Sequence, residues 1–164
     1  RGLGDVYKRQ GLVVDYVIIM GYDEHYVGSD AGSVASLPWV EQGVQDTIAE
    51  VTPERTILAI PFYTRLWKTT GGAVTSEAIG MDEAQNVLST NGVEVAWDGS
   101  VGQNYATFEQ DNSTYQIWLE DAQSIAEKVK LIQKYNLAGV AQWKLGFENS
   151  SIWQTISDNL QAAS

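Results

Sequence analysis

The chain has 164 residues, with 21 acidic and 10 basic side chains, so its net charge is −11. Hydrophobic residues make up 44% of it, and it contains six Trp, eight Tyr and three Phe. This content indicates a folded globular domain and excludes a disordered acidic chain. No apolar run approaches the roughly 20 residues that cross a bilayer, so we expect no membrane insertion.

The composition also restricts the chemistry. The chain has no cysteine, which excludes disulfides, thiolate catalysis and cysteine-ligated zinc. A single histidine leaves no histidine-rich metal site, and the acidic charge argues against a nucleic-acid partner. We therefore expect no metal and no cofactor, and either carboxylate chemistry or plain binding.

Residues 1–10 differ from the rest of the chain. They hold three of the ten basic residues and one acid, and they lack the apolar core and cleavage site of a signal peptide. We interpret them as a non-native leader that resembles a translated cloning remnant. The alternative is a native loop or helix end.

Residues 11–67 are expected to form βα units. A nearly continuous β-branched run at residues 12–20 is typical of a strand buried on both faces. An amphipathic helix is predicted for residues 38–51, because apolar residues recur every four positions and proline suits its first turn. Residues 56–63 form a second strand of the buried type, and the strand–helix–strand order indicates a βαβ unit.

The following segment differs in character. Residues 69–127 contain ten Asp or Glu and no Lys or Arg. The pattern predicts a helix at residues 81–88, a hairpin turn at Asp111-Asn112, and three short strands, at residues 93–97, 105–109 and 115–119. Antiparallel strands with one helix indicate an α+β insertion, with expected bounds 68–120.

The last segment, residues 121–164, returns to the first pattern. A helix at residues 121–135 begins with a capping Asp121 and ends at Asn136. A strand at residues 137–143 and a helix at 151–160 follow. The fold class is therefore α/β: about the last three βα units of an eight-stranded TIM barrel, with an α+β insertion before the final strand. A complete barrel takes about 250 residues.

The ends of the predicted strands carry aromatic side chains beside polar ones. Working residues of α/β barrels lie at these carboxyl ends. Here they read Met-Gly-Tyr-Asp at 20–23, Pro-Phe-Tyr-Thr-Arg at 61–65 and Gln-Trp at 142–143. Aromatic faces beside planar hydrogen-bonding groups suit sugar rings. The glycine-rich loop that a phosphate substrate calls for is not visible.

Four motifs in this order resemble glycoside hydrolase family 18, the chitinases and their relatives. They are Met-Gly-Tyr-Asp at 20–23, Ile-Pro-Phe-Tyr-Thr-Arg-Leu-Trp at 60–67, Ile-Trp-Leu-Glu-Asp at 117–121 and Val-Ala-Gln-Trp at 140–143. Residues 37–41, Leu-Pro-Trp-Val-Glu, resemble the bacterial branch associated with spore cortex and cell-wall glycans. The resemblance covers residues 12–158.

The resemblance implies hydrolysis of β-1,4-linked N-acetylglucosamine glycans, chitin or peptidoglycan. In this family the substrate's own acetamido oxygen is the nucleophile. Tyr22 would donate its hydroxyl to that acetamido group, and Asp23 would accept hydrogen bonds from sugar hydroxyls. Trp143 would form the floor under the sugar, and Tyr63 and Arg65 would line the next wall.

Four further residues are candidates for substrate binding: Met20, Trp67, Trp118 and Glu120. The alternative for the two tryptophans is that they pack the insertion against the barrel. A protein of this kind is expected to be a monomer at full length and to work outside the cytoplasm, in secretion, the cell wall or the spore.

Departures from the family pattern leave other interpretations open. The family's D-x-x-D-x-D-x-E motif, which carries the catalytic acid, does not occur in this sequence. Thr64 stands where many relatives have glycine, and Lys144 where an acidic residue is common. We interpret the chain as the C-terminal part of a glycosidase. The alternatives are a catalytically inactive, lectin-like relative and a freestanding small α/β module.

We predict that the 164-residue chain alone has no glycosidase activity, because general acid catalysis typically contributes about 10²–10⁴-fold. The measurement is release of the fluorophore from a fluorogenic chitobiose or chitotriose substrate by the purified chain. Turnover above a heat-inactivated control would contradict the prediction.

Overall fold

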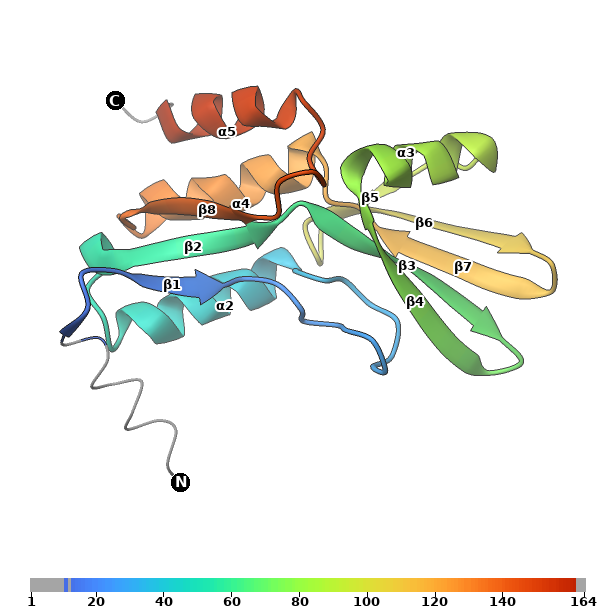
Figure 1. The fold of residues 1–164 in the computed structure, drawn as a ribbon, viewed down its shortest axis with the longest axis horizontal. Coiled ribbons are helices and arrows are strands. Elements are labelled where there is room, and N and C mark those ends of the chain that lie inside the picture. Colours follow the sequence, from blue (N-terminus) through green and yellow to red (C-terminus); the bar gives the residue numbers. More distant parts are fainter. Residues whose placement is uncertain (1–10, 12, 162–164) are drawn as a thin grey trace.

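The computed structural model describes residue 11 and residues 13–161, and these residues form two sheets (Figure 1). The first sheet is parallel, with the order β1-β2-β8, and consists of β1 (Val17–Met20), β2 (Thr56–Pro61) and β8 (Gly139–Trp143). Its helices are α2 (Leu37–Ile48), α4 (Ala122–Lys134) and α5 (Ile152–Gln161). A short 3₁₀ helix, Pro53–Arg55, precedes β2. The predicted α/β class is confirmed, and the described residues form part of a barrel without closing it.

The core lies between the parallel sheet and these helices. Leu58 and Ile60 of β2 are fully buried, and Val40 of α2, Val129 of α4 and Ile156 of α5 pack in the same cluster. Each buried side chain of this size contributes about 1.5–3 kcal/mol relative to exposure. The predicted apolar spacing of the helix that begins near residue 38 is thus confirmed, since Val40 and Val44 are the buried residues of α2.

The first strand differs from the prediction. β1 begins only at Val17, and its side chains alternate, with Ile19 packed against the core but Ile18 and Met20 57% and 69% exposed. The reason is that the core residues of the helices pack only against the face that carries Ile19, so the face that carries Ile18 and Met20 is open in the described residues. Residue 12 and the predicted leader, residues 1–10, lie outside the described residues.

The second sheet is antiparallel and extends away from the first (Figure 1). Its order is β4-β3-β7-β6-β5, and α3 (Met81–Thr90) packs against it. Its strands are β3 (Tyr63–Thr70), β4 (Ala73–Gly80), β5 (Ala96–Asp98), β6 (Gln103–Gln110) and β7 (Ser113–Trp118). The predicted turn at Asp111 and Asn112 is confirmed, and both residues have the positive φ, 49° and 56°, that a tight hairpin requires.

Two strands of this sheet, β3 and β4, were not predicted. β4 pairs with β3 through a hairpin at Gly71 and Gly72, whose φ values of 55° and 86° favour glycine. Since β3 already begins at Tyr63, the chain passes from one sheet to the other at Phe62. This point precedes the expected limit between residues 67 and 68, and the division into domains remains a prediction.

α4 is the best-specified helix. The Asp121 carboxylate accepts hydrogen bonds from the backbone N–H groups of Gln123 and Ser124, at 2.9 and 3.0 Å, and the Ser124 side chain completes a capping box. Asn136 follows the helix with φ 52°, as predicted for its end. The sequence therefore determines both ends of this helix.

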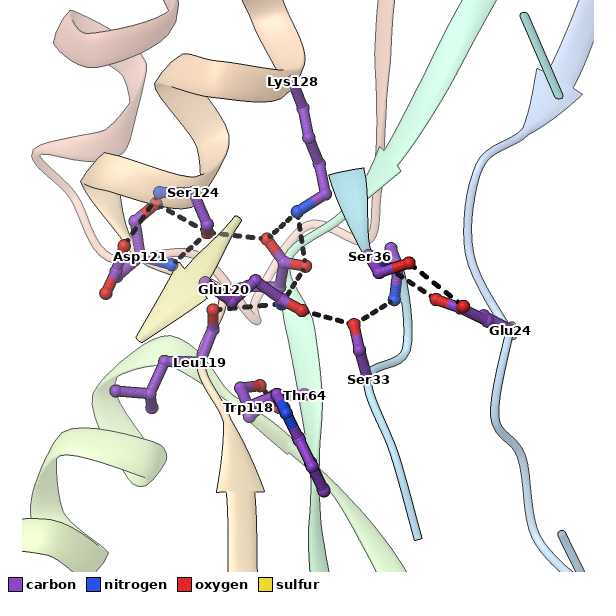
Figure 2. A network of polar contacts seen from close by, with 12 residues as sticks. Glu24, Ser33, Ser36, Thr64, Trp118, Leu119, Glu120, Asp121, Ser124 and Lys128 are labelled. Atoms are coloured by element: carbon purple, nitrogen blue, oxygen red, sulfur yellow. Dashed lines mark hydrogen bonds and ion pairs between the residues drawn. The ribbon is translucent and has the colours of Figure 1, made fainter. Parts of the chain in front are cut away.

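A buried ion pair joins α4 to the insertion. The Lys128 ammonium lies 3.0 and 3.1 Å from the two carboxylate oxygens of Glu120, and both side chains are inaccessible (Figure 2). Ser124 Oγ and Gln103 Nε2 also donate to Glu120, each at 2.8 Å. Removal of one partner would leave a buried charge without compensation.

We predict that Lys128→Met lowers the free energy of unfolding by about 3–5 kcal/mol, because it strands the Glu120 charge. Lys130→Met on the same helix is the matched control. It removes an exposed pair with Glu127, and such pairs contribute about 0–1 kcal/mol. The measurement is urea unfolding at pH 7, and losses of equal size would contradict the role given to the buried pair.

Candidate functional site

Three aromatic rings meet at the carboxyl ends of the parallel strands. Tyr22 follows β1, Tyr63 follows β2, and Trp143 is the last residue of β8. The ring of Tyr22 stacks on Trp143 at a centroid distance of 6.4 Å and 24° between planes, and meets Tyr63 edge-on at 6.2 Å. The sequence placed these three residues at the carboxyl ends of neighbouring strands. In the structure their rings lie in one cluster.

A carboxylate completes the cluster. The Tyr63 hydroxyl donates a hydrogen bond to Oδ1 of Asp23, whose side chain is exposed. Burial raises the pKa of Tyr63 well above its usual value, and the hydrogen bond and the charge of Asp23 act in the same direction. Tyr63 thus stays protonated and acts as a donor. The other oxygen of Asp23 makes no hydrogen bond within the described part of the chain.

Tyr22 offers a second hydroxyl. Its Oη has no hydrogen-bond partner among the described residues, and burial together with the nearby Asp23 charge raises its pKa. The hydroxyl therefore remains protonated near neutral pH and is open to a ligand. Trp143 is 52% exposed, so its indole offers an apolar face beside this donor. Such a pairing of ring face and donor suits a sugar.

Gly21 allows the backbone to approach β2 closely. Its N–H donates to the Ala59 carbonyl at 2.7 Å. A Cβ at this position would lie 2.9 Å from Leu58 Cδ1 and 3.0 Å from the Ala59 oxygen. The absence of a side chain thus keeps Tyr22, the next residue, at the strand end.

Two other predicted residues lie beside the cluster. Arg65 shares one face of β3 with Tyr63, and its positive charge opposes the rise of the Tyr63 pKa. Its Nη1 donates to Ser76 Oγ at 3.1 Å, and its Nε is buried with no partner in the described residues. Met20 ends β1 with an exposed side chain.

The structure does not bring the remaining three candidates into the cluster. Trp67 is only 1% exposed, and its Nε1 donates to the Gly32 carbonyl at 2.9 Å, so it packs the insertion against the loop after β1. Trp118 packs on Tyr105 at 4.8 Å, and Glu120 is buried against Lys128. We leave these three residues out of the proposed site.

Sequence reasoning missed one residue near the cluster. The ring of Phe147, in the loop after β8, lies 6.4 Å from Tyr63, and the Lys144 ammonium lies 4.6 Å from the Phe147 ring centroid. The signal was an aromatic residue shortly after a strand end. Phe147 also packs against Gly80, where a Cβ would lie 3.0 Å from its carbonyl oxygen.

The described residues contain neither a metal-binding cluster nor a membrane-spanning helix. No group of three or more His, Cys, Asp or Glu side chains there could hold a metal ion. No helix among them is long and apolar enough to cross a membrane.

Comparison with known proteins identifies the family of this chain. Residues 4–148 match glycosyl hydrolases family 18. The chain belongs to this family. A likeness to a solved structure, a chitinase from Chromobacterium violaceum, has a TM-score of 0.87 at 25% identity and covers 94% of this chain and 48% of that one.

Two curated relatives come from Bacillus subtilis. The glycosylase YvbX is 27% identical over 151 residues, and a cortical fragment-lytic enzyme is 26% identical over 155 residues. The matches cover 92% and 93% of this chain, but only 44% and 36% of the relatives. The chain thus spans less than half the length of either relative.

We predict that Gly21→Ala destabilises the chain by about 1–3 kcal/mol, because the added methyl group overpacks against Leu58 and Ala59. Gly43→Ala in α2 is the matched control. It meets nothing within 4 Å and is expected to stabilise the helix by about 0.5–1 kcal/mol. Urea unfolding measures both. A neutral Gly21→Ala would contradict the close approach described here.

Proposed function

We propose that a protein containing this chain hydrolyses β-1,4-linked N-acetylglucosamine glycans, chitin or peptidoglycan. The observation that carries the proposal is the cluster of Tyr22, Asp23, Tyr63 and Trp143, which joins a protonated hydroxyl, a carboxylate and an exposed indole. Family membership supports the reaction class. Because such glycans lie outside the cytoplasm, we propose the cell wall or the spore as the place of action.

The roles of the residues depend on their chemistry in the site. Trp143 stacks against the apolar face of an N-acetyl sugar, while the Tyr22 hydroxyl donates to its acetamido group. In substrate-assisted hydrolysis the acetamido oxygen attacks the anomeric carbon as the bond to the leaving oxygen breaks. Holding the acetamido group in line supplies part of the barrier reduction. The leaving oxygen also needs a proton, and no residue of this cluster is assigned as its donor.

Asp23 and Tyr63 act together in this proposal. Tyr63 donates to one carboxylate oxygen of Asp23, which leaves the other oxygen to accept from a sugar hydroxyl or from the acetamido N–H. A charged acceptor makes a stronger hydrogen bond than a neutral one. Arg65, next along the same strand face, lines the adjoining wall.

We predict different kinetic effects for the two central residues in an active protein that contains this chain. Tyr22→Phe removes a hydrogen bond that strengthens in the transition state. It should lower kcat, which corresponds to an increase of about 1.5–3 kcal/mol in the activation free energy. Trp143→Ala removes stacking used in ground and transition states alike, and should raise KM at least as much as it lowers kcat. The measurement is steady-state kinetics on a chitotriose substrate.

Melting curves of both variants are the control, because neither side chain belongs to the buried core. If Tyr22→Phe leaves kcat within about twofold of the wild type, its assisting role is wrong. Saturable glycan binding without turnover, in a protein that retains the whole barrel, would instead favour a lectin-like relative.

A further inference from the structure

The two ends of the loop after β1, residues 21–36, are joined by one acidic side chain, that of Glu24. Figure 2 shows both oxygens of this carboxylate directed at Ser36. The backbone N–H of Ser36 donates to Oε2 at 2.7 Å, and its hydroxyl donates to Oε1 at 3.0 Å. The N–H of Glu24 itself donates to the Val34 carbonyl at 2.8 Å. Three hydrogen bonds thus join the two ends of the loop.

The far end of this loop is fixed in the interior. Residues 32–36 are all buried, and the Ser33 hydroxyl donates to Oε1 of Gln103 in β6. The amide of Gln103 donates to the Leu119 carbonyl at 3.1 Å and to Glu120 at 2.8 Å. Glu120 is also bound by Lys128, so the loop is connected to the buried ion pair (Figure 2).

Every hydrogen bond that Glu120 makes in this network is one that its carboxylate accepts. Glu120 accepts from Gln103, Ser124 and Lys128 and donates to none, which is the pattern of an ionised carboxylate. Burial raises the pKa of Glu120, and the Lys128 charge acts in the opposite direction. Breaking any link would leave a buried polar group without a partner. Residues 33–36 are therefore a rigid anchor.

Asp23 lies directly between fixed points. On one side the N–H of Gly21 is bound to Ala59, and on the other side Glu24 is bound to Val34 and Ser36. The backbone of Asp23 has φ 66°, in the left-handed region, which is uncommon for a non-glycine residue although Asp adopts it more readily than most. The side chain of Asp23 is exposed, and its Oδ1 accepts a hydrogen bond from Tyr63.

We propose that Glu24 is a positioning residue: its hold on Ser36 fixes the backbone at Asp23, so that this carboxylate meets Tyr63 and presents its second oxygen to the glycan. The part that concerns the glycan rests on the proposed function, whereas the part that concerns Tyr63 does not. Nothing in the arrangement requires Glu24 to touch the ligand.

A double-mutant cycle between Glu24 and Tyr63 tests the positioning in the 164-residue chain. Tyr63→Phe alone should lower the urea midpoint, because it removes the bond to Asp23. In the Glu24→Ala background the same change should cause a clearly smaller shift, because that bond is already lost. Two residues linked only through Asp23 would then be coupled. Additive shifts would overturn the proposal.

Asp98→Ala is the matched control. Asp98 accepts from the N–H and the hydroxyl of Ser100, at 2.9 and 2.6 Å, which repeats the pair of donors that Glu24 has in Ser36. Its change should be additive with Tyr63→Phe. Glu24→Gln should restore most of the coupling, since its amide oxygen still accepts from Ser36. If Glu24→Ala fails to fold, Ser36→Ala, which removes one donor alone, takes its place in the cycle.

Calorimetric titration with tri-N-acetylchitotriose separates this proposal from the proposed function. Glu24→Ala should weaken binding by about threefold to tenfold, and Asp98→Ala should leave it unchanged. Wild-type binding that Glu24→Ala does not weaken would overturn the proposal for the glycan. A wild-type chain that does not bind would count against the sugar-binding role proposed for this cluster, while the cycle would still decide the positioning of Asp23.

Discussion

Parallel pairing of three short strands is the constraint on which the rest of the molecule depends. The register aligns Met20 with Ala59 and Pro61 with Trp143, so the three strands end at one edge of the sheet. Strand pairing alone therefore brings residues that lie far apart in the chain together at this edge. Because the backbone hydrogen bonds determine the register, a shift of one residue would turn every side chain of a strand to the opposite face.

The polar interior has a different logic. Two charged side chains and three neutral ones are buried and joined by hydrogen bonds, and backbone groups of Leu119 and Ala35 complete the network. An apolar cluster could fill the same space, but apolar contacts have no preferred direction, whereas hydrogen bonds do. The polar one specifies how the insertion and the loop after β1 are oriented, because its donors and acceptors match in one arrangement. We regard orientation, rather than stability, as its contribution to the structure.

Much of this could be predicted from local sequence, and the exceptions have physical reasons. α4 was predictable because its apolar period, Asp121 cap and Asn136 end all agree. β4 was not, because most of its side chains are exposed and it lacks an apolar pattern, although Gly71-Gly72 marked its hairpin. The cluster of Tyr22, Tyr63 and Trp143 followed from strand ends. Burial of Trp67 did not, because a loop distant in sequence covers that part of the strand face.

The passage from one sheet to the other at Phe62 has a consequence for protein engineering. The backbone N–H of Phe62 donates to the Trp143 carbonyl at 2.7 Å. The next residue, Tyr63, already belongs to the antiparallel sheet. The insertion therefore begins inside the cluster instead of at its margin. A shortened protein that splices β2 directly to α4 would keep the strands of the parallel sheet and yet lose the phenol that donates to Asp23. In this architecture the added module supplies one residue of the cluster, Tyr63, and it cannot be trimmed as an accessory.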